Sequence, residues 1–134
     1  MPRFSQSSFT KLTTCHHDLQ VLFHEVVKTF DCKVLEGYRN KDDQDMAVAL
    51  GNSKIHWPQG KHNHHPSMAV DVAPFPINWR KPNTFYWFAG YVMGIAQKLK
   101  EEGKMTHSVR FGGDWDNDNI EDNGFKDLCH FELV

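Results

Sequence analysis

Histidine is the residue type whose placement along the chain first indicates chemistry. The 134 residues include nine histidines, and four of these fall within the fifteen residues from 53 to 67. A loop histidine in this region precedes Asp71, and near the end of the chain Asp127 precedes His130. A catalytic zinc takes three protein ligands from histidine, aspartate, glutamate or cysteine and leaves a fourth position for water. The two segments together therefore predict a metal centre.

The segment around His130 has the alternation of a strand with one apolar face. His130 and Glu132 share one face of this expected strand, and Phe131 lies on the other. The strand can therefore bury Phe131 and aim His130 into a cleft. Asp127 stands three residues before His130, where a carboxylate that is not a ligand can accept a proton from metal-bound water. Glu132 is the second candidate for this base, because it shares the face of His130.

The elements that position these residues follow from hydrophobic spacing and from turn residues. Apolar residues at intervals of three and four predict helices, whereas alternation predicts strands. Helices and strands are interspersed without a βαβ repeat, so we expect an α+β domain with a small antiparallel sheet packed against helices. The expected helices span residues 18–30, 42–50 and 83–103, the last capped by Asn83, and the expected strands span residues 32–37, 68–73, 109–111 and 129–134.

Two of the expected strands carry candidate residues of the site. The strand at 32–37 ends at a glycine and delivers Arg39 to its tip. Alternation in the strand at 68–73 places Asp71 among small neighbours, on the face opposite the larger apolar residues. A long polar loop carries the histidines between these strands, and such loops are usually functional or mobile.

The composition limits the kind of protein. Apolar residues make up 40%, aromatic residues 13% and charged residues 24%, which indicates one globular domain over residues 1–134. The net charge of −2 argues against nucleic acid as a partner. No stretch has the character of a membrane span or an export signal. We therefore expect a monomer that is made and folds in the cytoplasm of the producing cell, without membrane insertion.

The three cysteines are expected to be free thiols. Cys15, Cys32 and Cys129 cannot all pair within one chain, and none belongs to a C-x-x-C motif. Cys129 adjoins His130, but alternation should place it with Phe131 on the opposite face of the strand. We therefore interpret Cys129 as a buried structural thiol and not as a ligand.

Several blocks of sequence, taken in order, cover nearly the whole chain and carry a resemblance to a known family. The blocks are Phe4-Ser5, His17-Asp-Leu-Gln20, Glu36-Gly-Tyr-Arg39 with Gln44, Lys61-His62 to Asp71-Val-Ala-Pro74, Arg110-Phe-Gly-Gly-Asp-Trp115 and His130-Phe-Glu-Leu-Val134. They resemble the zinc D,D-/L,D-peptidases related to VanX and VanY, in particular the phage endolysins that are L-alanyl-D-glutamate peptidases. The resemblance implies a Hedgehog/D,D-peptidase-like zinc fold.

The resemblance also implies roles for individual residues. Zinc would be held by a histidine of the 61–71 block together with Asp71 and His130. Asp127 would be the general base, and Arg39 would bind or polarise the substrate carbonyl.

The identity of the first zinc ligand depends on which form of the family pattern applies. The wider family has seven positions from histidine to aspartate, which selects His64, whereas the K-H-N…P-S-x-A-V-D block of the phage subgroup selects His62. We favour His62, because the chain resembles the phage subgroup more closely. The remaining His56, His65 and His107 are interpreted as solvated side chains.

The function that the resemblance implies is zinc-dependent hydrolysis of the L-alanyl-D-glutamate bond in the stem peptide of bacterial peptidoglycan. A D-Ala-D-Ala carboxypeptidase with the same metal centre is the alternative enzyme. A noncatalytic zinc-binding module is the alternative outside enzymes, since the Hedgehog signalling domain shares the metal arrangement and acts by binding. Asp127 favours an enzyme, because a structural zinc needs no base beside its ligand.

An acidic segment from Asp114 to Asp122 contains five carboxylates in nine residues. Such a density could bind calcium through oxygen ligands. The segment has no glycine at its sixth position and no glutamate at its twelfth, so it lacks the EF-hand spacing. A solvated acidic loop is the favoured interpretation; calcium is the alternative, because some phage relatives are regulated by calcium.

Overall fold

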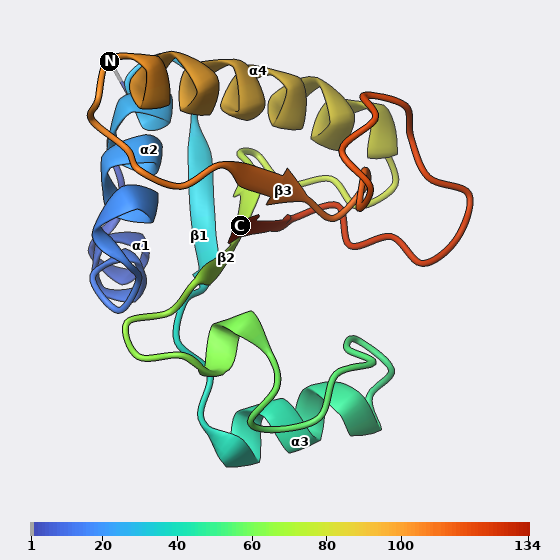
Figure 1. Ribbon diagram of the computed structural model, residues 1–134. Coiled ribbons are helices and arrows are strands. Elements are labelled where there is room, and N and C mark those ends of the chain that lie inside the picture. The colour runs from blue at the N-terminus through green and yellow to red at the C-terminus, as the bar shows by residue number, and fades with distance from the viewer. Residues whose placement is uncertain (1) are drawn as a thin grey trace.

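The computed structural model describes residues 2–134, and within them four α-helices and one 3-10 helix surround a four-stranded sheet (Figure 1). The strands lie in the order β1-β2-β4-β3, and every neighbouring pair is antiparallel. The predicted α+β architecture with a small antiparallel sheet is confirmed. The elements are α1 (Gln6–Leu12), α2 (His17–Val27), β1 (Cys32–Glu36), α3 (Lys41–Ala49), η1 (Lys61–Asn63), β2 (Ala69–Pro74), α4 (Pro82–Glu101), β3 (Val109–Phe111) and β4 (His130–Leu133).

The hydrophobic core lies between the sheet and the helices α2 and α4, which Figure 1 shows beside and above the strands. Phe131 of β4 packs against Phe23 of α2 and Phe88 of α4, with ring centroids 5.4 and 6.1 Å apart. Val70 and Val72 of β2 are fully buried in the same core. Burial of such a side chain stabilises the fold by roughly 1.5–3 kcal/mol. Because these residues face the core, their neighbours along β2 and β4 lie on the opposite face of the sheet.

Helix α1 is an element that the sequence analysis did not predict. It begins after Ser5, whose hydroxyl accepts the backbone N–H of Ser8 at 3.1 Å. Its seven residues bury only Ser8 and Leu12. So short a helix has too few turns to show an apolar period, which is why the pattern did not reveal it.

The three predicted helices differ from the structure at their ends, α3 by one residue at each end and α2 and α4 by up to three. Helix α2 ends at Val27 and not at residue 30, and the N–H of Thr29 donates to the carbonyl oxygen of Val26, three residues back, in the tighter pattern common at helix ends. Helix α4 begins at Pro82, so Asn83 is not its cap. Proline suits the first helical position, where no intrahelical N–H bond is lost. Among residues 2–134, neither the 20-residue α4 nor any other helix is long and apolar enough to cross a membrane.

Helix α3 and the long loop after it form a layer below the sheet in Figure 1. The turn after α3 contains Gly51 with a φ of 77°, a conformation that favours glycine. Gln44, buried on the inner side of α3, donates to the carbonyl oxygen of Ile55 at 2.6 Å and to the hydroxyl of Ser53 at 3.1 Å. These hydrogen bonds hold the start of the predicted polar loop against α3.

Candidate metal centre

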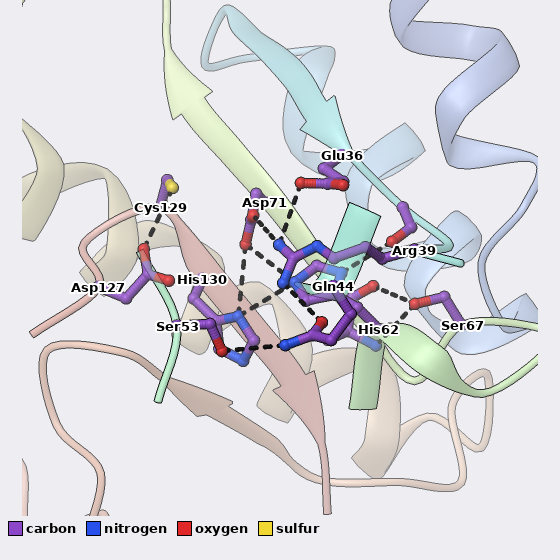
Figure 2. A network of polar contacts seen from close by, with 12 residues as sticks. Glu36, Arg39, Gln44, Ser53, His62, Ser67, Asp71, Asp127, Cys129 and His130 are labelled. Atoms are coloured by element: carbon purple, nitrogen blue, oxygen red, sulfur yellow. Dashed lines mark hydrogen bonds and ion pairs between the residues drawn. The ribbon is translucent and has the colours of Figure 1, made fainter. Parts of the chain in front are cut away.

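The side chains of three residues converge in one buried cluster, which we call the metal group: His62 of η1, Asp71 of β2 and His130 of β4 (Figure 2). The Nε2 atom of His62 lies 3.2 Å from Oδ1 of Asp71 and 3.3 Å from Nδ1 of His130. His130 Nδ1 lies 3.3 Å from the same Asp71 oxygen. Asp71 and His130 are register partners in the β2–β4 ladder, which places their side chains on one face. The structure thus brings the three predicted ligands together.

The outer nitrogen of each histidine in the group faces a hydrogen-bond acceptor. His62 Nδ1 donates to the carbonyl oxygen of Gly37 at 2.7 Å, and His130 Nε2 donates to Oε1 of Glu132 at 2.8 Å. When both rings are neutral, as a metal requires, each turns its unprotonated nitrogen toward the centre. Two lone pairs and the Asp71 carboxylate repel one another at such distances unless a cation lies among them. This donor set of two imidazoles and one carboxylate fits zinc.

The pKa values within the group are shifted by the same contacts. Burial would raise the pKa of Asp71, but the imidazoles of His62 and His130 hold it well below its ordinary value. Burial would lower the pKa of His130, but hydrogen bonds with Asp71 and Glu132 raise it to about 9. In metal-free protein at neutral pH a proton therefore supplies the positive charge, and a metal ion must displace it.

The other candidate histidines lie outside this group. His64, the alternative first ligand, is exposed, as are His56 and His65. The expectation of a solvated side chain is wrong for His107, whose Nδ1 atom donates to Oδ2 of Asp18 at 2.8 Å. This contact joins residues that are 89 positions apart, so the local sequence around His107 gives no sign of it.

Arg39 lies behind Asp71 and is buried. Its Nη2 donates to Glu36 at 3.0 Å and to Asp71 Oδ2 at 3.5 Å, and its Nη1 donates to Gln44 at 3.0 Å (Figure 2). Burial opposes its charge, but contact with Glu36 raises the pKa of Arg39 above its usual value, so it stays cationic. The guanidinium orients the Asp71 carboxylate and also lines the adjacent cleft. Its contact with a substrate carbonyl stays a prediction.

Asp127 lies beside the metal group, at the turn before β4. Its backbone N–H donates to the carbonyl oxygen of Gly112 at 2.8 Å, and its own carbonyl accepts from the N–H of His130 at 3.1 Å. A Cβ atom at residue 112 would overlap the Asp127 carbonyl, so the close approach requires glycine. A carboxylate oxygen of Asp127 lies within 4.8 Å of one of Asp71. Burial and the charge of Asp71 raise the pKa of Asp127, which suits a proton acceptor.

Cys129 lies closer to the site than the sequence analysis predicted. Strand β4 begins at His130, so the alternation used for Cys129 does not reach it. Its Sγ atom lies 3.3 Å from Oδ1 of Asp127, and the residue is only partly buried. Burial and the carboxylates of Asp71 and Asp127 raise the pKa of the Cys129 thiol, which therefore stays protonated and donates to Asp127. Cys15 and Cys32 are buried free thiols, as predicted.

A cleft of about 550 Å³ opens beside the metal group, between the loop at 52–61 and the loop at 115–125. Trp115 packs against His130, with centroids 5.4 Å apart, and stacks on Phe125 at 6.3 Å. The Nζ atom of Lys54 in the opposite loop lies 5.0 Å from the centre of the Phe125 ring. A cleft of this size, with apolar walls and a few polar groups, suits a small ligand or a short peptide.

Four carboxylates of the acidic segment lie close together. Asp114, Asp116, Asp118 and Asp122 each offer an oxygen within 4.8 Å of the others. Asp114 accepts the backbone N–H groups of Asp118 at 3.2 Å and of Asn119 at 2.9 Å. Asn119 has a φ of 66°, the conformation that a glycine would supply. The carboxylates therefore bond the loop's own backbone, and calcium binding stays a prediction.

The fold has a counterpart among solved structures. The chain is similar to the crystal structure of the Serratia marcescens L-Ala D-Glu endopeptidase ChiX, with a TM-score of 0.73 and 23% sequence identity. The match covers 99% of this chain and 91% of that one. The two chains share one fold, a small α+β domain.

The family is shown by the sequence itself. The family model of the phage L-alanyl-D-glutamate peptidases matches residues 1–134, and the chain belongs to this family. No curated protein matches the chain. Family membership supports an enzyme that acts on peptidoglycan and agrees with the resemblance that the sequence blocks predicted.

Proposed function

We propose that this protein hydrolyses the L-alanyl-D-glutamate bond of the peptidoglycan stem peptide, with zinc held by His62, Asp71 and His130. The observation that carries the proposal is the convergence of three ligand atoms at 3.2–3.3 Å beside a further carboxylate, that of Asp127. Membership of the phage L-alanyl-D-glutamate peptidases supports the choice of bond. The protein would act as a monomer on the cell wall, after synthesis in the cytoplasm.

The residues around the metal group have separate roles in the proposed reaction. Zinc, when bound, supplies a Lewis acid that polarises a carbonyl and lowers the pKa of water toward 7. Asp127 accepts the proton of the attacking water and returns it to the leaving amine. Arg39 holds Asp71 in place and binds the substrate carbonyl from the wall of the cleft.

The cleft supplies the binding surface for the peptide. Trp115 and Phe125 form an apolar wall next to His130. Lys54 carries a positive charge at the opposite loop, where it can meet a carboxylate of the acidic stem peptide. Contacts with both loops of the cleft would hold the reacting carbonyl near the metal group.

Mass analysis of the fragments released from purified peptidoglycan tests the proposed bond. Cleavage at the proposed bond produces new L-alanine carboxyl ends and new D-glutamate amino ends. Release of D-alanine would support a D-Ala-D-Ala carboxypeptidase in its place. Zinc binding without release of any fragment would support a noncatalytic module.

A further inference from the structure

Glu132 is a buried acidic residue to which the proposed mechanism gives no role. It is 7% exposed, and its Oε1 lies 2.8 Å from Nε2 of His130. We propose that Glu132 is a positioning residue that fixes the His130 ring with Nδ1 toward the metal. This inference rests on the proposed zinc site, because it concerns how one ligand of that site is oriented.

The orientation of His130 is not determined by the ring alone. A neutral imidazole has one N–H and one lone pair, and a flip of the ring exchanges the positions of the two nitrogens. An acceptor at Nε2 keeps the hydrogen on that nitrogen and leaves the lone pair on Nδ1. Glu132 is such an acceptor, since its Oε1 lies 2.8 Å from Nε2 of His130 while Arg110 donates to its other oxygen, Oε2.

Glu132 is itself held in place by residues of β3 and η1. Arg110 of β3 is its register partner in the β3–β4 ladder and donates from Nη2 to Oε2 at 2.8 Å. The Nζ atom of Lys61 lies 4.0 Å from the same oxygen and donates to the carbonyl oxygen of Leu133. With Oε2 bound to a cation, Oε1 stays directed at His130.

The two histidines of the group therefore have different partners. His62 is fixed by the backbone carbonyl of Gly37, which no side-chain substitution removes. His130 is fixed by the carboxylate of Glu132, which also adds a negative charge near the metal. Loss of such an outer partner typically weakens metal binding by about 10–100-fold. Of the two histidines, a substitution at Glu132 thus changes the support of His130 and leaves the support of His62 unchanged.

The test measures zinc affinity by competition with a chelator for the wild type, Glu132→Ala, Glu132→Gln and the control Arg110→Gln. We expect Glu132→Ala to weaken zinc binding by about 10–100-fold. Glu132→Gln should lose less zinc affinity than Glu132→Ala, because one acceptor oxygen remains. If the alanine variant does not fold, the glutamine variant takes its place in the test. Arg110→Gln removes one of the two cations at Oε2, but Lys61 still lies 4.0 Å from that oxygen and Oε1 still faces His130. This variant should therefore weaken binding by no more than about fivefold, the value of a partly exposed ion pair.

A second measurement distinguishes positioning from general stability. The proton on Nε2 of His130 should give a slowly exchanging NMR signal in metal-free and zinc-loaded wild type, and Glu132→Ala should lose it. Unchanged zinc affinity in Glu132→Ala, or an equal loss in Arg110→Gln, would overturn the proposal. A wild type that binds no zinc contradicts the proposed function instead, and the signal in metal-free protein then still decides whether Glu132 fixes His130.

Discussion

Asp71 and His130 face each other across the β2–β4 ladder, with Oδ1 of Asp71 3.3 Å from Nδ1 of His130. The adjacent pair in the register, Val70 and Phe131, points into the core. The packing of the core therefore sets the spacing of the two ligands on the opposite face. Arg39, which follows β1, donates to Oδ2 of Asp71, and Glu132 of β4 accepts from Nε2 of His130.

Replacement of His130 tests the metal group directly. We expect the wild type to hold about one zinc ion per chain and His130→Ala to lose most of it, because two protein ligands are too few. Metal content after dialysis, measured by mass spectrometry, checks this. Full zinc occupancy in His130→Ala would contradict the assignment of His130 as a ligand.

A pair of histidine variants tests the identity of the first ligand. His62→Ala should lose zinc and activity, because His62 lies 3.2 Å from Asp71 and is buried. His64→Ala is the matched control and should keep most of both, because His64 is exposed. Metal content and peptidoglycan cleavage are measured for both variants. The reverse outcome would establish the shorter spacing to Asp71, with His64 as the ligand.

A pair of glycine variants tests the position of Asp127. A Cβ atom at Gly112 would overlap the carbonyl oxygen of Asp127, so Gly112→Ala should displace the base and lower both activity and thermal stability. Gly94 of α4 has no atom within 4 Å of its Cβ position, so Gly94→Ala should stabilise the helix by about 0.5–1 kcal/mol. Thermal unfolding and cleavage rates compare the two. Wild-type activity in Gly112→Ala would argue against the tight contact.

Asp18 should make the stability of the fold depend on pH. Burial raises its pKa, but hydrogen bonds from His107 and Thr106 lower it to about 2. A carboxyl with a lowered folded-state pKa stabilises the fold above its unfolded pKa, and this contribution is lost as the pH falls through the folded value. Asp18→Asn should therefore cost on the order of 2 kcal/mol of unfolding free energy at neutral pH.

The difference between Asp18→Asn and the wild type should shrink as the pH falls from about 4 to about 2, the window between the two pKa values. Urea unfolding at a series of pH values measures it. A difference that stays constant across this window would show that the carboxylate charge of Asp18 does not stabilise the fold.

The sequence allowed the strands of the site to be predicted because their patterns are local. Alternation in the segments of Asp71 and His130 is enough to place both side chains opposite the core. The spacing of apolar residues likewise predicted α2 and α4, whose inner faces are buried.

Features that depend on distant contacts could not be predicted in this way. The partner of His107 lies in α2, and the position of Cys129 depends on where β4 begins. The cap of α4 depends on a choice between neighbouring Lys81 and Asn83 that the sequence pattern does not decide. In each case the feature depends on a contact that forms only in the folded chain, and the propensities of the neighbouring residues do not predict that contact.

The most direct test of the central claim is the behaviour of Asp127→Asn, assayed for bound zinc and for peptidoglycan cleavage in the same preparation. The amide keeps the shape of the side chain but cannot accept the proton. We predict a folded protein with about one zinc ion per chain and a hydrolysis rate lower by roughly 10²-fold or more, the scale of a lost general base. Cleavage at a rate near that of the wild type would contradict the account.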